Sequence, residues 1–203
     1  LRISKLTGRA WGGQIDASGS ASAKGALAVQ LNANGVNVNA LLKDVAGKDI
    51  LEGTGRVQAN VTTSGNTVGA LRSNLAGTAA LQLRDGAVKG INLAKSFRQA
   101  KATLTGRQDA VSKAQQTEKT DFSELTATAQ IANGVARSND LDAKSPFLRL
   151  GGAGTFDIGK GRIDYVAKGT AVATTAGQDS APAALQGVTI PVQLSGPFEA
   201  IDW

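Results

Sequence analysis

Two carboxylates, Asp140 and Asp142, are the nearest approach in this chain to a catalytic pair. They lie two residues apart, so they share one face of any strand that contains them. A pair that works as acid and base requires burial or a cleft that drives the two pKa values apart. The surrounding sequence indicates neither, and charged side chains are seldom fully buried. We therefore expect both aspartates at a solvated strand end.

The composition excludes most other site chemistry. The chain has no histidine, cysteine or methionine. It therefore lacks the commonest general base and the best nucleophile. Disulfides, zinc–thiolate sites and histidine–metal sites are excluded for the same reason. We expect no enzymatic activity, no metal site and no cofactor.

The segment from Gly154 to Gly161 nearly matches a phosphate-binding loop. Such a loop needs Ser or Thr directly after its lysine, and then a helix. Here Gly161 follows Lys160, and a strand-like segment comes next. We interpret the segment as a strand and a hairpin turn.

Alternating apolar residues indicate the elements that carry these side chains. Residues 77–88 and 152–163 read almost alike, each with a glycine start, alternating apolar positions, a glycine-containing turn and an apolar restart. Period two is typical of strands with one apolar face. Turn signals are predicted at 34–35, 64–66, 85–86, 133–134 and 159–161, because glycine reaches positive φ without steric cost.

Helical signals are few. Residues 39–45 predict a short helix, capped by Asn39 and ended by Gly47. Residues 67–73 predict a single helical turn. Apolar residues spaced by four, three and four predict one longer amphipathic helix near 92–104. We expect a flexible segment at 106–120 and a loop at 174–186.

These patterns predict one mainly β domain over residues 1–203. Its core would be a long, twisted, curled antiparallel sheet, a groove or half-barrel, with a few short helices and the helix near 92–104. The aromatic residues number only eight, too few for a dense two-layer core. The net charge of +6 favours anionic surfaces such as lipid head groups. Nucleic acid is not expected, since basic patches interleaved with stacking aromatics are missing.

Several segments resemble the C-terminal region of the AsmA family. They are the glycine–leucine–Asp-Gly segment at 75–93, the Thr-Asp-Phe and Asn-Gly segment at 120–135, the strand pair at 145–158 and the Ile-Pro-Val closing segment at 190–203. Ala10-Trp11-Gly12-Gly13 is similar to the family's opening motif. The last four residues depart from the pattern, because they lack the family's common proline.

The resemblance implies a protein of the bacterial cell envelope. It implies a periplasmic domain, anchored to the inner membrane by an N-terminal helix outside this sequence. It also implies a non-enzymatic role in outer-membrane assembly and in lipid homeostasis or transport through an apolar β-groove. The implied partners are phospholipid or another envelope lipid, and other envelope proteins.

Three sets of residues are candidates for lipid handling. The groove lining would be Leu81, Leu83, Val88, Leu125, Ile131, Leu150, Phe156, Ile158, Ile163 and Tyr165. A plug or gate would be formed by Leu93, Phe97 and Leu104, with Lys95, Arg98 and Lys101 contacting head groups. The alternative for the first set is an ordinary core, and for the other two a helix packed on the sheet with a solvated basic face.

Two other classes of protein remain open. A secreted or surface adhesin would show a fixed repeat length, whereas the similar units begin near 53, 77 and 152 at unequal intervals. An outer-membrane barrel would need aromatic girdles, which so few aromatics do not supply.

Overall fold

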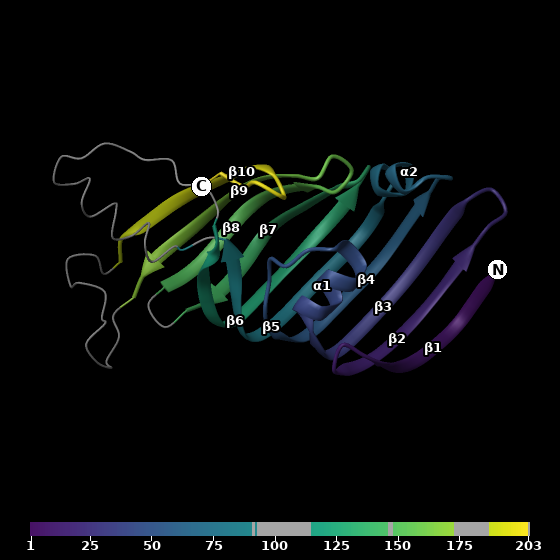
Figure 1. Cartoon of the computed structure of the whole chain (residues 1–203), viewed down its shortest axis with the longest axis horizontal. Coiled ribbons are helices and arrows are strands. Elements are labelled where there is room, and N and C mark those ends of the chain that lie inside the picture. The colour runs from purple at the N-terminus through teal and green to yellow at the C-terminus, as the bar shows by residue number, and fades with distance from the viewer. Residues whose placement is uncertain (91, 93–114, 146–147, 173–186, 203) are drawn as a thin grey trace.

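The computed structural model describes residues 1–90, 92, 115–145, 148–172 and 187–202 of the 203-residue chain. Ten strands form one antiparallel sheet, and each strand pairs with the next in sequence (Figure 1). The strands are β1 (Arg2–Ala10), β2 (Gly13–Ala21), β3 (Ala26–Asn37), β4 (Thr54–Ser64), β5 (Ala76–Gly90), β6 (Gln115–Ala132), β7 (Val135–Lys144), β8 (Leu148–Asp157), β9 (Arg162–Ala171) and β10 (Thr189–Pro197). The predicted mainly β, antiparallel fold is confirmed, and the sheet is not closed.

Tight turns join several of the strands. Trp11 and Gly12 link β1 to β2, and Asn133 and Gly134 link β6 to β7; all four have positive φ. Two-residue loops of this kind match the twist of the strands they join. The predicted turn at 133–134 is confirmed, as are those at 64–66 and 159–161.

Two predicted turns are wrong. Asn34-Gly35 lies inside β3, and Asp85-Gly86 lies inside β5. Gly35 has φ 66°, and the pairing register shifts beside it. Asp85 has φ 49°, and Leu51 pairs with Val88 whereas Thr54 pairs with Arg84, so β5 carries one extra residue. Both sites are bulges, because positive φ serves a bulge as well as a turn.

Both short helices are where the sequence predicts them. They are α1 (Val38–Ala46) and α2 (Val68–Ser73). Gly47 ends α1 with φ 66°, as predicted, but the N-terminal cap is Asn37, whose side chain accepts a hydrogen bond from the Ala40 amide at 3.0 Å. Asn39, the predicted cap, instead donates its Nδ2 to Asp49.

Other predictions fall on residues that the structure does not describe. The amphipathic helix near 92–104 lies there apart from Asn92, and so does the loop at 174–186. The predicted flexible segment at 106–120 is corrected in its last part. Residues 115–120 form the start of β6, which pairs with the end of β5.

Register gives the sheet one apolar and one polar face. The row Ile15, Ala33, Val57 and Leu81 crosses β2 to β5 through direct pairs, and its members are buried or half-buried. Neighbouring positions form an opposite-face row of Gln14, Asn34, Arg56 and Gln82. Because an antiparallel sheet can leave one face in water, the polar face needs no cover.

Candidate functional site: the apolar face of the sheet

The apolar face carries one continuous cluster of buried side chains. Leu83, Leu125, Ala143 and Leu150 pair directly across β5 to β8 and are all buried. The same cluster extends into β9 and β10 and back to β2. It therefore runs along most of the sheet.

The burial ends before the apolar face does. Ile3, Leu6 and Val29 continue the pattern in β1 and β3, opposite Gly19 and Ala17 of β2, yet they are 47%, 57% and 44% exposed. The apolar face is thus filled toward β10 and open toward β1.

The sheet curls so that the apolar face is its concave side. Lys48, which follows α1, forms an ion pair with Glu199, which follows β10. The same connector pairs with β5 through Leu51. In a flat sheet β5 and β10 would lie about 24 Å apart. The ion pair therefore requires the two parts to approach each other on the side that α1 occupies.

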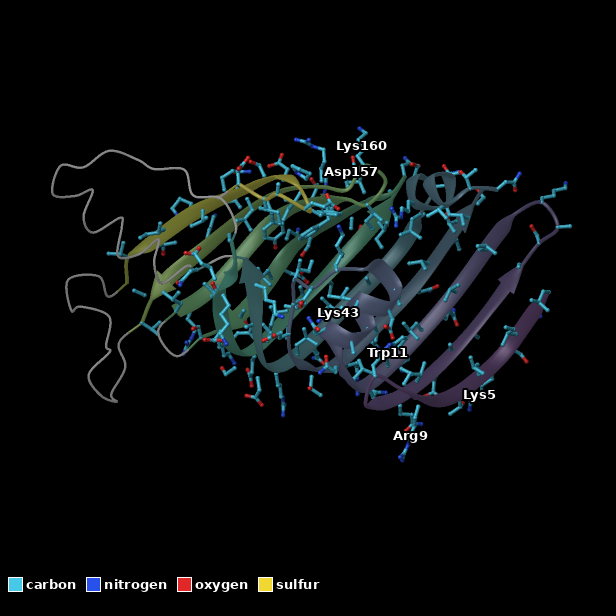
Figure 2. All side chains as sticks on the ribbon, in the orientation of Figure 1. Lys5, Arg9, Trp11, Lys43, Asp157 and Lys160 are labelled. Carbon is cyan, nitrogen blue, oxygen red and sulfur yellow. The ribbon has the colours of Figure 1, made fainter. Side chains whose placement is uncertain are left out.

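Helix α1 covers part of the apolar face, over β3 and β4 (Figure 1). Val38 and Leu41 are buried, and Leu42 packs against the same cluster. Trp11 donates its Nε1 to Oδ2 of Asp44 at 2.7 Å, which ties the β1–β2 turn to the helix. Figure 2 shows Trp11 and Lys43 on this side of the sheet.

A charged network fixes the connector after α1. Asp49 forms ion pairs with Lys43 (3.1 Å) and Lys89 (2.7 Å) and accepts a hydrogen bond from Asn39 (2.6 Å). The hydrogen bond from Lys89, followed by those from Asn39 and Lys43, holds the pKa of Asp49 well below its usual range. The network is a structural clamp for α1.

One aromatic pair lies on the apolar face. The rings of Phe156 and Tyr165 have centroids 5.2 Å apart, at 37°. Gly154 pairs with Tyr165, and a Cβ there would lie 2.8 Å from the ring atom Cδ2. Burial raises the pKa of the Tyr165 hydroxyl, opposed by a hydrogen bond with Ser138.

The two aspartates considered from the sequence do not form a catalytic pair. Both are exposed. The Asp140 carboxylate accepts hydrogen bonds from the hydroxyl (2.6 Å) and amide (2.9 Å) of Thr128, which lower its pKa. Asp142 lies on the polar face, paired with Thr126. Asp140 thus stabilises an irregular stretch of β6 and β7.

The structure brings together eight of the ten residues predicted to line a groove. Leu83, Leu125, Leu150, Ile163 and Tyr165 are buried members of the cluster, and Leu81, Val88 and Phe156 are partly buried against it. Ile131 is buried outside this cluster, and Ile158 lies in the β8–β9 turn. Their role in lining a lipid groove stays a prediction.

The other predicted lipid-handling residues cannot be placed. Leu93, Phe97 and Leu104 of the plug, and Lys95, Arg98 and Lys101 of the head-group site, lie outside the described residues.

Sequence reasoning missed the N-terminal part of the apolar face. Val36, Val38, Leu41 and Val57 belong to the cluster. The alternation of Leu27, Val29 and Leu31 is a signal for this part of the face, although the predicted lining begins only at Leu81.

A hollow of about 480 Å³ lies at the ends of β2, β3 and β4, lined mainly by serine, threonine and alanine and by none of the ten predicted residues. Within the described ranges, no group of acidic residues could hold a metal ion. No helix there is long and apolar enough to cross a membrane.

The AsmA family model matches residues 1–141, which span β1 to β6 and most of β7. This chain belongs to the AsmA family. Comparisons with curated proteins and with solved structures found no significant match. Membership in the AsmA family implies a role in biogenesis of the bacterial cell envelope and outer membrane, in a family that is generally non-enzymatic.

Proposed function

We propose that this AsmA-family chain is a periplasmic, non-catalytic domain that handles phospholipid. Acyl chains would lie on the apolar face, and head groups would stay in water at its margin. The net charge of +6 suits anionic head groups. An inner-membrane anchor outside this sequence would hold the domain in place.

The open end of the apolar face is the observation that supports this proposal most directly. Ile3, Leu6 and Val29 stay exposed on the concave side, in line with the buried cluster. Covering apolar surface is worth roughly 25 cal/mol per Å². An acyl chain seated there would gain this free energy without a polar group having to be buried.

The alternative of a surface adhesin is less well supported. Such a protein would bind through its exposed polar face, and AsmA membership favours the envelope role. The experiment below separates the two, because it compares the two faces directly.

A photo-crosslinking amino acid at Val29 or at Gln30 tests the lipid role. The two positions are adjacent on β3 and exposed, but they face the apolar and the polar side respectively. Both variants would be made in the periplasm of a diderm bacterium, irradiated in cells and examined by mass spectrometry. We expect phospholipid adducts at Val29 and few or none at Gln30.

Native mass spectrometry of the unmodified protein provides a second readout. Bound phospholipid should survive gentle purification and be lost when Val29 and Leu6 are both replaced by glutamate. Equal labelling at Val29 and Gln30, or no lipid adduct at either, would overturn the lipid role for this domain.

A further inference from the structure

The chain after α1 and the chain after β10 meet across the concave side of the sheet. Lys48 follows Gly47, which ends α1, and it forms an ion pair with Glu199, which follows β10. The two residues are 151 positions apart in the sequence. We call residues 47–53 and 198–202, joined by this ion pair, the strap. It connects the two sides of the curl.

Each half of the strap is held firmly on its own side. In the first half, Glu52 exchanges two backbone hydrogen bonds with Ala87 of β5, of 2.8 and 3.3 Å, and the charged clamp described above adds to them. In the second half, Asp202 exchanges two backbone hydrogen bonds with Ser195 of β10, of 3.0 and 2.8 Å, and Phe198 packs against the apolar cluster. Each half is therefore fixed to the strand beside it.

The polar link between the two halves is weak by comparison. The side chain of Glu199 is 68% exposed, and that of Lys48 is 27% exposed. Among the described residues, no other hydrogen bond or ion pair joins residues 38–53 to residues 187–202. Exposed ion pairs contribute little to stability, because water and salt screen them. The strap is thus well anchored at both ends and loosely joined in the middle.

The apolar cluster contains side chains from both sides of the curl. Val38 and Leu41 of α1 belong to the same buried cluster as Val192 and Leu194 of β10. In a flat sheet β3, which leads into α1, would lie about 34 Å from β10. The two sets share one cluster because the sheet curls. The curled state therefore keeps the predicted lining residues of β8 and β9 packed inside the protein.

The sheet is irregular between the two halves of the strap. Pairing of β6 with β7 is interrupted between Thr126 and Gln130, and pairing of β7 with β8 is interrupted between Ser138 and Leu141. Irregular pairing of this kind bends strands and changes their twist. The irregular stretch lies between β5, which holds the first half of the strap, and β10, which holds the second. A change in curl at this stretch would break few ladder hydrogen bonds.

We propose that the strap opens and closes the part of the apolar face on β8 to β10. When the ion pair parts, these strands swing away from α1 about the irregular stretch and uncover Leu150, Phe156 and Tyr165. The inference rests on the proposed lipid role, because an acyl chain is the ligand that would cover the opened face. Exposed apolar surface is unfavourable in water, so the closed state predominates without lipid. A lipid that binds only the open state shifts the balance toward it.

Distance measurements between two spin labels test the opening without lipid. The chain has no cysteine, so Val45→Cys on α1 and Ala200→Cys in the strap, both exposed, provide two unique sites. We expect one short distance at low salt and an added longer one in Glu199→Gln. Salt at about 1 M, where the Debye length falls to about 3 Å, should have the same effect. Asp142→Asn, which removes a carboxylate of the polar face, should change nothing, and the exchange Lys48→Glu/Glu199→Lys should restore the short distance.

A reversible bridge across the strap tests what the opening admits. Lys48→Cys/Glu199→Cys would be joined by a reducible crosslinker that spans the two side chains it replaces. A photo-crosslinking amino acid would stand at Phe156 or at Val29, and the purified protein would be irradiated with phosphatidylglycerol. We expect lipid adducts at Phe156 only after the bridge is reduced, and adducts at Val29 in both states. Lys48→Cys alone, treated in the same way, controls for the reagent.

The two experiments separate the strap from the lipid role. A single distance that stays unchanged in Glu199→Gln and at high salt would overturn the strap, and so would equal labelling of Phe156 with and without the bridge. Labelling of Val29 but never of Phe156 would also overturn it and leave the lipid role standing. If the distances respond as expected but Val29 captures no lipid, the opening is supported and the lipid role fails.

Discussion

The ammonium of Lys89 on β5 lies 2.7 Å from Oδ1 of Asp49 in the connector between α1 and β4. Lys89 also lies 2.8 Å from Oε1 of Glu52. Hydrogen bonds with Asp49, and then with Glu52, raise the pKa of Lys89, while Lys89 lowers that of Asp49. These contacts hold the connector along β5, and with it the helix that covers part of the apolar face.

Asp49→Asn should lower the free energy of unfolding at pH 7. The pKa of Asp49 is lower in the folded chain than in the unfolded one, so its contribution is complete above about pH 4 and is lost as the pH falls toward the folded pKa. The difference between wild type and variant should therefore shrink below pH 4. Urea unfolding followed by circular dichroism at pH 7, 4 and 3 measures it.

Asp142→Asn is the control, because this exposed carboxylate lies on the polar face away from the clamp. It should leave stability nearly unchanged at each pH. A stability difference for Asp49→Asn that stays constant from pH 7 to pH 3 would contradict the assigned network. Added salt should reduce the difference at pH 7, since exposed ion pairs are screened.

Tyr165 should resist ionisation at alkaline pH. It is the only tyrosine of the chain, so absorbance at 295 nm reports it alone. Burial raises its pKa, so its contribution to stability is complete below about pH 10 and is lost as the pH rises through the folded pKa. A titration in buffer should have its midpoint above the one measured in urea. Coincident midpoints would show that the hydroxyl is accessible to solvent, and Tyr165→Phe should retain more stability than wild type above pH 10.

The sequence was sufficient for the strands and for the one-sided burial, because alternation with period two encodes both. It could not separate turns from bulges. Asp85-Gly86 carries the same residues that close a hairpin, and only the pairing of Leu51 with Val88 shows that β5 continues. Whether such a segment forms a turn or a bulge depends on a pairing partner that is far away in the sequence.

The sequence predicts the C-terminal half of the buried apolar cluster and misses its N-terminal half. Leu83, Leu125 and Leu150 could be named because large side chains mark the alternation there. In β2 and β3, small residues such as Ala33 occupy the same face. They are buried because the pairing register places them there and because α1 covers them. The curl of the sheet was predicted, but the contacts that accompany it, such as Lys48 with Glu199, could not be, because they join residues far apart in the sequence.

A leucine in the buried part of the apolar face and one at its open end should differ in their contribution to stability. Leu83 is 2% exposed, and Leu83→Ala should cost about 2–5 kcal/mol. Leu6 lies on the same face but is largely exposed, so Leu6→Ala should change stability by less than about 0.5 kcal/mol. Urea denaturation of the two variants measures the difference, and similar losses would mean that the open end is filled in solution.

A methyl group added at Gly86 should destabilise the bulge of β5. A Cβ there would lie 2.1 Å from the carbonyl oxygen of Glu52 and 2.5 Å from Cζ of Phe122. The carbonyl oxygen is hydrogen-bonded to Ala87 and cannot move freely, so Gly86→Ala should cost about 1–3 kcal/mol. At Gly8 of β1 a Cβ meets no atom within 4 Å, and Gly8→Ala should be neutral or slightly stabilising. Thermal unfolding of the two variants compares them, and a neutral Gly86→Ala would show that the connector does not pack on β5 as described.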